Sequence, residues 1–326
     1  MKVIQYGLGP IGREIVKIIL SRSNLQLVGA IDIDPSLLGQ DVGTLVDHKK
    51  INVHVQKSIN DIDKIDPQTY VLVATTSDLK TCVQHIRPIV EKGLSVITTC
   101  EELSCPDETL PEVVLLKNWC QQYKVKILGT GINPGFLMDF LPLVMSGLTN
   151  KIEKIIIQRV QDASQRRIPF QEKIGAGLDV GTFRELVQQQ KIRHVGLRES
   201  SFLLKNALGL NIDNYIESIE PVIAIFDHEH IKQGQVLGVE QILKCTFKGE
   251  EVIRLVFIAS LFEEDPIDSI EIYGVPDVKI HFTSPVRGDD GTAIVLVNAL
   301  KGLAQLVPGF YTMSDLTLMK CTNHHE

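Results

Sequence analysis

The sequence predicts an α/β protein with an N-terminal doubly wound parallel sheet and an inserted α+β domain that contains a mixed sheet. Short apolar strands alternate with single helices up to about residue 130, and this alternation implies right-handed crossovers between parallel strands. Beyond residue 134 the candidate strands become long and are joined by short turns, which favours an antiparallel or mixed sheet. The 326 residues are enough for two domains that each bury a core.

In the first domain, apolar runs predict the strands, and apolar spacing and caps predict the helices. The segment 2–6 is the first strand, and the apolar residues from Ile11 to Ile19 then recur at the spacing of a helix that packs one face on a sheet. A later helix begins at Ser77 or Asp78, either of which can cap it, and ends near Gly93. A further helix is predicted over 109–122, and strands are predicted over 25–32, 51–55, 70–75, 94–99 and 125–129.

The second half is predicted to carry helices on one face of its sheet. Such a sheet can place a substrate near a cofactor and can build a dimer interface. The segment 288–310 is predicted to be a helix whose Ala, Val and Leu face packs back on the first domain. The predicted domains are therefore 1–133, an inserted substrate-binding and dimerisation domain 134–287, and a returning segment 288–326. Within the insertion, helices are expected over 179–192 and 197–209, and strands over 151–161, 215–226, 235–248, 251–262 and 267–282.

A glycine-rich segment, Gly7-Leu8-Gly9-Pro10-Ile11-Gly12, lies directly between the first strand and the first helix. In this context Gly7 makes the turn, Gly9 lets the backbone approach a pyrophosphate, and Gly12 lets helix and strand pack closely. The helix N-terminus faces the anion. The pattern predicts a Rossmann-type dinucleotide site to which Pro10 and Ile11 also belong. The alternative is a structural turn that binds nothing.

Asp32 ends the second predicted strand and indicates which dinucleotide is bound. A carboxylate at this position accepts hydrogen bonds from the ribose hydroxyls and repels a 2′-phosphate. NAD is therefore the expected cofactor, while Arg13 beside the loop leaves NADP open. Thr75 and Thr76, which follow the strand 70–75, are further candidates for cofactor binding.

Two segments are candidates for the chemistry itself. TTCEEL, residues 98–103, follows a strand at the carboxyl edge of the sheet, where ligands bind in open α/β sheets. Its Glu102 and Glu101 are candidate acid–base groups, although a solvated acidic pair is the alternative. GTGINPGF, residues 129–136, offers Asn133 and Pro134 to the cofactor and Phe136 to the substrate, whereas a plain hinge would have the same sequence.

A basic cluster in the second half suits an acidic substrate. The segment 159–177 gathers Arg159, Arg166, Arg167 and Lys173 around a glycine-rich turn. Arginine pairs well with carboxylates because its planar guanidinium donates two parallel hydrogen bonds. These arginines are therefore candidates for substrate binding. Surface charge or salt bridges between subunits explain the same cluster equally well.

Composition narrows the function classes. The formal charge of −7 argues against nucleic acid as a partner, and no apolar run approaches the roughly 20 residues of a membrane span. The N-terminus also lacks the pattern of a secretory signal. Six cysteines without zinc-type spacing predict reduced thiols and a cytoplasmic protein. Histidines at 227–230 and 324–326 are expected to be solvated, so no metal site is predicted.

Several of these segments together resemble a known family. The sequence resembles the 2,4-diaminopentanoate dehydrogenases and the related native amine dehydrogenases, a branch of the dihydrodipicolinate-reductase-like fold. The resemblance spans nearly the whole chain, and its middle three motifs are more specific than the glycine loop. The motifs are YGLGPIGREI, VGAIDIDPSLLGQDVG, TTCEEL, GTGINPGFLMDFLPL, RRIPFQEKIGAG and the final VNAL followed by VPGFYTMSDL.

The resemblance implies NAD(P)-dependent oxidation of a primary amine to a ketone with release of ammonia, and the reverse amination. In the reaction of the family, 2,4-diaminopentanoate gives 2-amino-4-oxopentanoate. The resemblance also places the catalytic glutamate at Glu102, with Glu101 as second choice, and implies a small-molecule amine or ketone partner and a homodimer. True dihydrodipicolinate reductases carry a His-His-x-x-x-Lys stretch before a Ser-Gly-Thr-Ala motif, and this chain shows neither.

Two alternatives stay open on the sequence alone. One is an imine, dihydropyridine or dihydrodipicolinate-type reductase that uses the same site without releasing ammonia. The other is a non-catalytic protein that senses NAD(H) and binds a partner. Steady turnover of an amine excludes the sensor, and free ammonia excludes the simple imine reductase.

Overall fold

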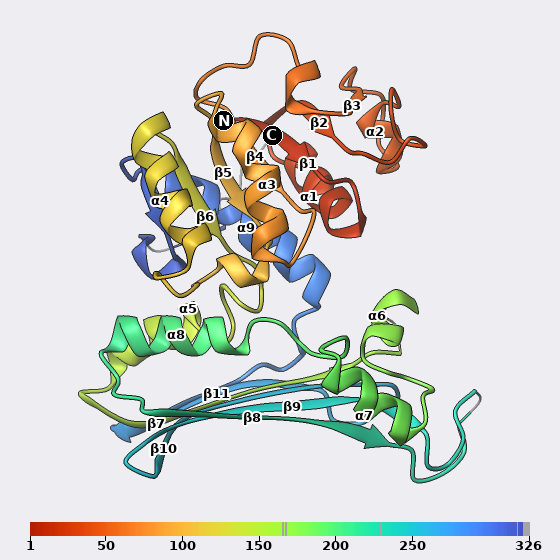
Figure 1. The fold of residues 1–326 in the computed structure, drawn as a ribbon, viewed down its shortest axis with the longest axis vertical. Coiled ribbons are helices and arrows are strands. Elements are labelled where there is room, and N and C mark those ends of the chain that lie inside the picture. Colours follow the sequence, from red (N-terminus) through yellow and green to blue (C-terminus); the bar gives the residue numbers. More distant parts are fainter. Residues whose placement is uncertain (165, 167, 229, 318, 322–326) are drawn as a thin grey trace. The chain divides into compact units, whose positions relative to one another are not determined.

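The computed structural model describes residues 1–164, 166, 168–228, 230–317 and 319–321, and the chain forms two compact units (Figure 1). Unit 1 consists of Met1–Phe140 and Arg287–Glu326, and unit 2 consists of Leu141–Val286. The junction predicted after residue 133 therefore lies inside unit 1. The loop is attached to another segment of unit 1, because the N–H of Ile132 donates to Oγ1 of Thr292 at 3.3 Å.

Unit 1 is built on a parallel sheet that, in the described part of the chain, has seven strands in the order β13-β6-β5-β4-β1-β2-β3. The chain leaves β1 in one direction through β2 and β3 and then runs in the other direction from β4 onward, so the sheet reverses its order between β1 and β4. This arrangement confirms the predicted doubly wound sheet. The strands are β1 Lys2–Tyr6, β2 Gln26–Ile31, β3 Val55–Gln56, β4 Tyr70–Val73, β5 Ser95–Thr98, β6 Lys126–Gly129 and β13 Gly309–Tyr311.

The helices of unit 1 begin where the sequence supplies a start signal. Asp78 caps α3 by accepting the N–H of Thr81 at 2.8 Å, and α1 and α4 each begin with a proline. The apolar faces of α3 and α4 pack on a core that includes Ile4, Val71 and Ile127. The bounds are α1 Pro10–Leu20, α2 Val42–Leu45, α3 Leu79–Val90, α4 Pro111–Tyr123 and α9 Gly288–Ala304, with 3-10 turns η1 Ile59–Asp61, η2 Glu101–Leu103 and η4 Met313–Asp315.

Two predictions for unit 1 were wrong in detail. The strand expected over 51–55 is reduced to β3, because the buried carboxylate of Asp41 accepts the N–H groups of Ile51 and Asn52 that a ladder would need. The helix expected over 288–310 ends at Ala304, and the last part of that segment forms β13 beside β6. Pro308 cannot continue a helix, so a strand after it is sterically reasonable.

Unit 2 contains a mixed sheet whose described strands follow the order β12-β11-β7-β10-β9-β8. Only the pair β7 and β10 is parallel among these neighbours, which confirms the predicted sheet type. The strands are β7 Lys151–Asp162, β8 Asn214–Ile223, β9 Val236–Phe247, β10 Glu250–Ser260, β11 Ile267–Val275 and β12 Val278–His281. The strand predicted over 267–282 is thus split into β11 and β12, because Pro276 cannot donate a ladder hydrogen bond and the chain turns there.

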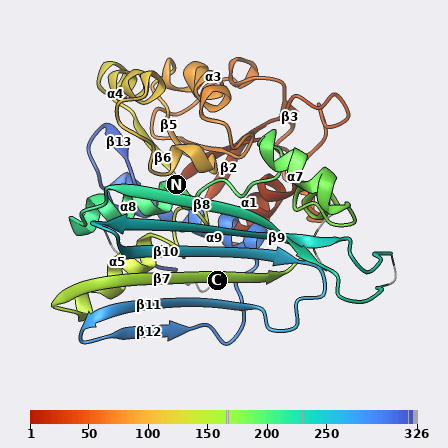
Figure 2. The same cartoon turned by 60° about the horizontal axis from the view of Figure 1, so that its bottom comes forward.

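The helices of unit 2 lie on one face of its sheet. Helix α8 packs on β9 and β10, and α7 packs on β8. Figure 2 looks onto the opposite face, which no described helix of this unit covers. The bounds are α5 Phe140–Met145, α6 Ile168–Lys173, α7 Val180–Gln188 and α8 Leu197–Leu208, with the 3-10 turn η3 Ser146–Leu148. Across both units, none of the described helices combines the length and the apolar character needed to cross a lipid bilayer.

Candidate cofactor and active site

The strand ends of unit 1 form one continuous edge. Hydrogen bonds extend the ladder past the strands: Gly7 N–H donates to Ile31 O at 2.8 Å, and Ala74 N–H donates to Tyr6 O at 2.8 Å. Thr130 N–H likewise donates to Thr98 O at 2.9 Å. The glycine loop, the segment after β4, the segment after β5 and the GTGINPGF segment therefore all leave the sheet at its carboxyl edge. This is the edge at which open α/β sheets bind ligands.

The three glycines of the loop differ in what surrounds them. Gly7 has φ +92°, and a Cβ there would lie 2.4 Å from Ala74 O. A Cβ on Gly12 would lie 1.8 Å from Gly7 O, so loop and helix touch at this point. A Cβ on Gly9 would meet no heavy atom within 4 Å, and no acidic residue stands in the first turn of α1. The open space at Gly9 and the helix N-terminus fit a pyrophosphate.

Gln5, on β1, holds the glycine loop by a side-chain hydrogen bond. This role was not predicted from the sequence. The side chain of Gln5 is fully buried, and its Nε2 donates to the carbonyl of Gly7 at 2.8 Å. A buried polar residue inside an apolar strand, KVIQY, is the signal that could have identified it, because such a residue needs a specific partner.

Asp32 lies at the end of β2, as predicted, and already contacts the loop. Its Oδ2 accepts the N–H of Leu8 at 2.6 Å, and its Oδ1 accepts the N–H of Asp34 at 2.9 Å. Arg13 lies on the same loop, with its Nε donating to Leu8 O at 2.9 Å. The carboxylate thus holds the loop in place at the position where a ribose would be recognised.

Thr75 and Thr76 begin the connection from β4 to α3. Thr75 Oγ1 is 2.8 Å from Nδ1 of His85, and Thr76 Oγ1 accepts the N–H of Asp78 at 3.1 Å. Burial lowers the pKa of His85, so the imidazole is neutral near pH 7. Depending on the tautomer, its Nδ1 either accepts the hydrogen bond of the threonine hydroxyl or donates to it. Both threonines stand at the edge predicted for cofactor contacts.

Glu102 is held by the start of α3. Its Oε2 accepts the N–H of Leu79 at 2.9 Å, and its own N–H donates to Ser77 O at 3.3 Å. The turn η2 also packs on the end of β6, since a Cβ on Gly129 would lie 2.5 Å from Leu103 O. The carboxylate of Glu102 is therefore fixed beside the segment that follows β4. Glu101, its half-buried neighbour in η2, belongs to the same edge.

The GTGINPGF segment forms a compact turn. The peptide bond between Asn133 and Pro134 is cis, and Asn133 is 7% exposed. Phe136 is only half-buried, and its ring lies 5.9 Å from that of Phe140. A cofactor or substrate role for these three predicted residues stays a prediction.

The predicted arginines lie in unit 2, and Arg159 is tied into its sheet. Arg159 is 3% exposed, its Nε pairs with Asp268 Oδ1 at 2.9 Å, and its Nη2 donates to Val286 O at 2.8 Å. This buried pair lies within one chain, so it is neither the surface charge nor the salt bridge between subunits that the sequence left open. Arg166 lies over the ring of Phe170, 4.1 Å from its centroid, and Arg167 lies outside the described residues. Their role in substrate binding stays a prediction.

His194 lies on the same face of unit 2 and was not predicted. Its ring stacks on Phe257 with centroids 4.0 Å apart, and burial, together with the positive charges of Lys173 and Arg159, lowers the pKa of His194 to about 3. The imidazole is therefore neutral at physiological pH. A histidine in the basic segment KIRH gave no specific signal, because lone histidines are common at ordinary core positions.

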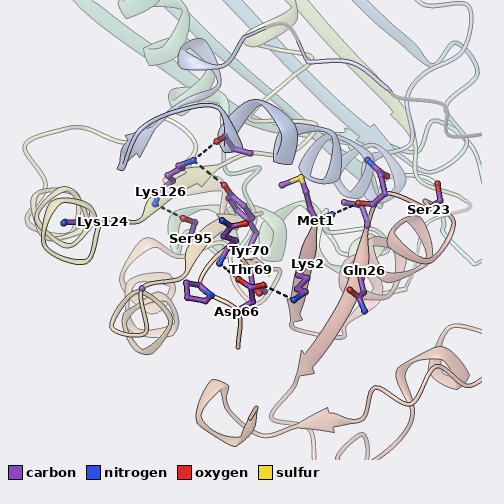
Figure 3. Close-up of a pocket in the computed structure, with 16 residues that line it drawn as sticks. Met1, Lys2, Ser23, Gln26, Asp66, Thr69, Tyr70, Ser95, Lys124 and Lys126 are labelled. Atoms are coloured by element: carbon purple, nitrogen blue, oxygen red, sulfur yellow. Dashed lines mark hydrogen bonds and ion pairs between the residues drawn. The ribbon is translucent and has the colours of Figure 1, made fainter. Parts of the chain in front are cut away.

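A cavity of about 810 Å³ in unit 1 lies at the opposite, amino edge of the sheet (Figure 3). Lys126 Nζ donates to Ala304 O at the end of α9 at 2.8 Å, and Lys2 Nζ pairs with Asp66 at 2.9 Å. Cations near a helix C-terminus compensate its unpaired carbonyls. These contacts account for Lys126 and Lys2 without a ligand, and the glycine loop and Glu102 lie at the other edge. We therefore place the site at the carboxyl edge.

No group of histidine, cysteine and carboxylate side chains among the described residues could hold a metal ion. His228, in the predicted solvated stretch 227–230, stacks on Phe262 with centroids 4.3 Å apart. Glu229 and the stretch 324–326 lie outside the described residues.

Comparison with known proteins adds the family. Residues 136–325 match the family of 2,4-diaminopentanoate dehydrogenase C-terminal domains, and this match covers more than half of the chain. The chain belongs to this family. Residues 1–102 match the N-terminal domain of dihydrodipicolinate reductase. The resemblance stated from the sequence motifs is thereby confirmed.

Individual relatives span the chain from end to end. The 2,4-diaminopentanoate dehydrogenase of Acetoanaerobium sticklandii is 28% identical, over 97% of this chain and 93% of its own. The amine dehydrogenase of Streptomyces virginiae is 24% identical over 98% and 96%. A solved amine dehydrogenase from Mycobacterium smegmatis superposes with a TM-score of 0.85 at 21% identity, covering 99% of this chain and 97% of that one. This last likeness confirms the fold.

Proposed function

We propose that this chain is an NAD(P)-dependent amine dehydrogenase. It oxidises a primary amine such as 2,4-diaminopentanoate to a ketone plus ammonia, and it catalyses the reverse reductive amination of ketones or 4-oxo acids. Membership of a dehydrogenase family makes the chain an oxidoreductase. The structural observation that supports the reaction is the common edge of one parallel sheet, which presents both the Gly7–Gly12 loop and Glu102.

The residues of the loop fit a dinucleotide. The open space at Gly9 can take a pyrophosphate. The first turn of α1 has no acidic residue, so the positive end of the helix dipole can face this anion. The carboxylate of Asp32 offers acceptors for the ribose hydroxyls. Bound NAD(P) would supply the chemistry of hydride acceptance and donation, which no side chain can perform. The side chains and backbone of the protein bind and orient the cofactor and the substrate, and they transfer protons.

The carboxylate of Glu102 is the proposed proton acceptor, with Glu101 second. Hydride can leave the carbon that bears nitrogen only when the nitrogen lone pair is free, so a base must keep the amine neutral. Once it has released this proton to solvent, the same carboxylate can orient and deprotonate the water that adds to the resulting C=N bond. The proton taken from the water then passes to the nitrogen of the adduct, and ammonia leaves as the C–N bond breaks. The carboxylate is suited to this work because Oε2 accepts the N–H of Leu79, which keeps the group in place at the carboxyl edge of the sheet.

The dinucleotide preference follows from Asp32. We expect NAD to bind more tightly than NADP, and Asp32→Ala to narrow the ratio of the two dissociation constants. Because Asp32 also accepts the N–H of Leu8, the substitution should weaken both cofactors, and the ratio is the informative quantity. Titration of both reduced cofactors on wild type and variant measures it. A wild type that prefers NADP by tenfold, about 1.4 kcal/mol, would show that Asp32 does not select the cofactor.

The sheet of unit 2 supports a homodimer. Its face opposite to α7 and α8 carries a short apolar row in which Val256 pairs with Ile242 and Ile258 pairs with Val160, flanked by polar side chains such as Gln158 and Glu240. A second copy could cover this row by packing sheet on sheet, about 10 Å apart. Light scattering should give twice the 36.3 kDa of one chain, and a monomeric mass would contradict the proposal.

Five buried cysteines support a cytoplasmic location.

A screen in the direction of amination tests the activity. NADH is mixed with ammonia and a panel of 4-oxo acids and simple ketones, and its oxidation is followed by absorbance. The proposal requires that oxidation depend on both ammonia and a carbonyl compound. Reduction of preformed imines without use of ammonia would favour the imine reductase, and binding of NADH without any turnover would favour the sensor.

A further inference from the structure

We propose that Asp139 is a positioning residue of the active site, because its buried carboxylate fixes the turn that carries Asn133 and Phe136. The inference rests on the proposed function and adds a residue that neither the sequence nor the family comparison singled out. Asp139 contributes no chemistry to the reaction in this account. It sets where the predicted cofactor and substrate contacts of the turn stand.

Two short hydrogen bonds carry the argument. Oδ2 of Asp139 accepts the N–H of Gly135 at 2.7 Å, and Oδ1 accepts the N–H of Phe140 at 2.6 Å. Asp139 is 1% exposed. A buried carboxylate is costly unless it is well bonded, and charge-assisted bonds of this length are the strong kind. One side chain thus joins the middle of the turn to the residue that begins α5.

The turn has little freedom once these bonds form. Gly135 has φ +122°, and a Cβ there would lie 2.4 Å from Gly131 N and 2.8 Å from Thr130 Oγ1. The carbonyl of Ile132 also accepts the N–H of Leu137 at 2.9 Å. The backbone from 130 to 137 is therefore packed against itself. The carboxylate of Asp139 holds this packed turn to the start of α5 through its bonds to Gly135 and Phe140.

The side chains of the turn differ in how far they are exposed to solvent. Asn133, Leu137 and Met138 are buried, whereas Phe136 keeps part of its ring accessible. A shift of the turn by a fraction of an ångström would move Phe136 and Asn133 together. Catalysis is sensitive to such shifts, since a misplacement of about 1 Å can cost about 10² in rate.

The test compares Asp139→Asn with a matched control. Asparagine has nearly the same shape, but its NH₂ group donates and cannot accept one of the two N–H bonds. The control is Asp41→Asn, which alters another buried carboxylate of unit 1 that accepts backbone N–H groups, those of Ile51 and Asn52. Asp41 has no place in the proposed site. Both variants should lose thermal stability.

We expect Asp139→Asn to lower kcat about tenfold or more while the NADH dissociation constant changes less than about threefold, because the glycine loop holds the phosphates. Asp41→Asn should leave kcat within about twofold of wild type. If Asp139→Asn does not fold, Asp139→Ser, whose hydroxyl still accepts one N–H without adding an amide donor, replaces it. A kcat that falls equally in the two aspartate variants, or stays near wild type in the Asp139 variant, overturns the positioning role. Turnover by the wild type decides the proposed function separately.

Discussion

Glu102→Gln is expected to lower kcat by about 10² or more in both directions, the usual scale for a positioned acid or base. Glutamine matches glutamate in size and keeps an oxygen that can accept the N–H of Leu79, so the start of α3 should stay in place. It cannot take a proton from the amine or from water. NADH affinity should stay close to wild type because the phosphates are held by the Gly7–Gly12 loop. Steady-state kinetics and NADH titration measure the two effects.

Glu101→Gln is the matched control, because Glu101 is the adjacent carboxylate in the same 3-10 turn. We expect a much smaller loss of kcat from this variant. A large loss at Glu101 alone would move the proton acceptor one residue along the chain. Near-normal rates in both variants would remove η2 from the mechanism.

Gly9→Ala is expected to weaken NADH binding by about tenfold to 10²-fold without loss of thermal stability. The structure has room for the methyl group, since a Cβ at Gly9 meets no heavy atom within 4 Å, and φ at this residue is −62°. That room is where the backbone is proposed to meet the pyrophosphate. The substitution therefore separates a binding defect from a folding defect. Thermal denaturation and NADH titration on the same preparation show both.

Gly147→Ala provides the comparison for this effect. A Cβ at Gly147, in η3 of unit 2, also meets nothing within 4 Å. We expect this variant to match wild type in stability and in NADH affinity. If Gly9→Ala behaves like Gly147→Ala, the pyrophosphate does not approach the loop at Gly9.

The sequence predicts most of unit 1 because its signals are local. Alternating apolar segments and a glycine loop between a strand and a helix were enough to predict the doubly wound sheet. Ser77 or Asp78 was expected to cap the next helix, and Asp78 caps α3. Failures arose where a distant or irregular contact decides the structure. The carboxylate of Asp41 takes the N–H groups that strand 51–55 would need, and β13 forms only because it pairs with β6, far away in the sequence.

For the site, too, local sequence signals could be read and contacts between distant side chains could not. The segments that reach the carboxyl edge could be predicted, because parallel strands place their ends together. Their internal bonds could not: Glu102 bonded to Leu79, Gln5 bonded to Gly7 and the closing carboxylate of Asp139 all depend on side-chain packing in three dimensions. From the sequence Arg159 was a candidate for binding an acidic substrate, with surface charge or a salt bridge between subunits as the alternatives, and only the structure reveals its buried pair with Asp268.

One assay tests the central claim most directly. The purified chain is incubated with NAD and 2,4-diaminopentanoate, and NADH formation and ammonia release are measured in the same reaction. We expect steady formation of both in equal amounts, and the loss of both in Glu102→Gln. NADH formed without ammonia, or no NADH formed with this or any other primary amine, would contradict the assignment as an amine dehydrogenase.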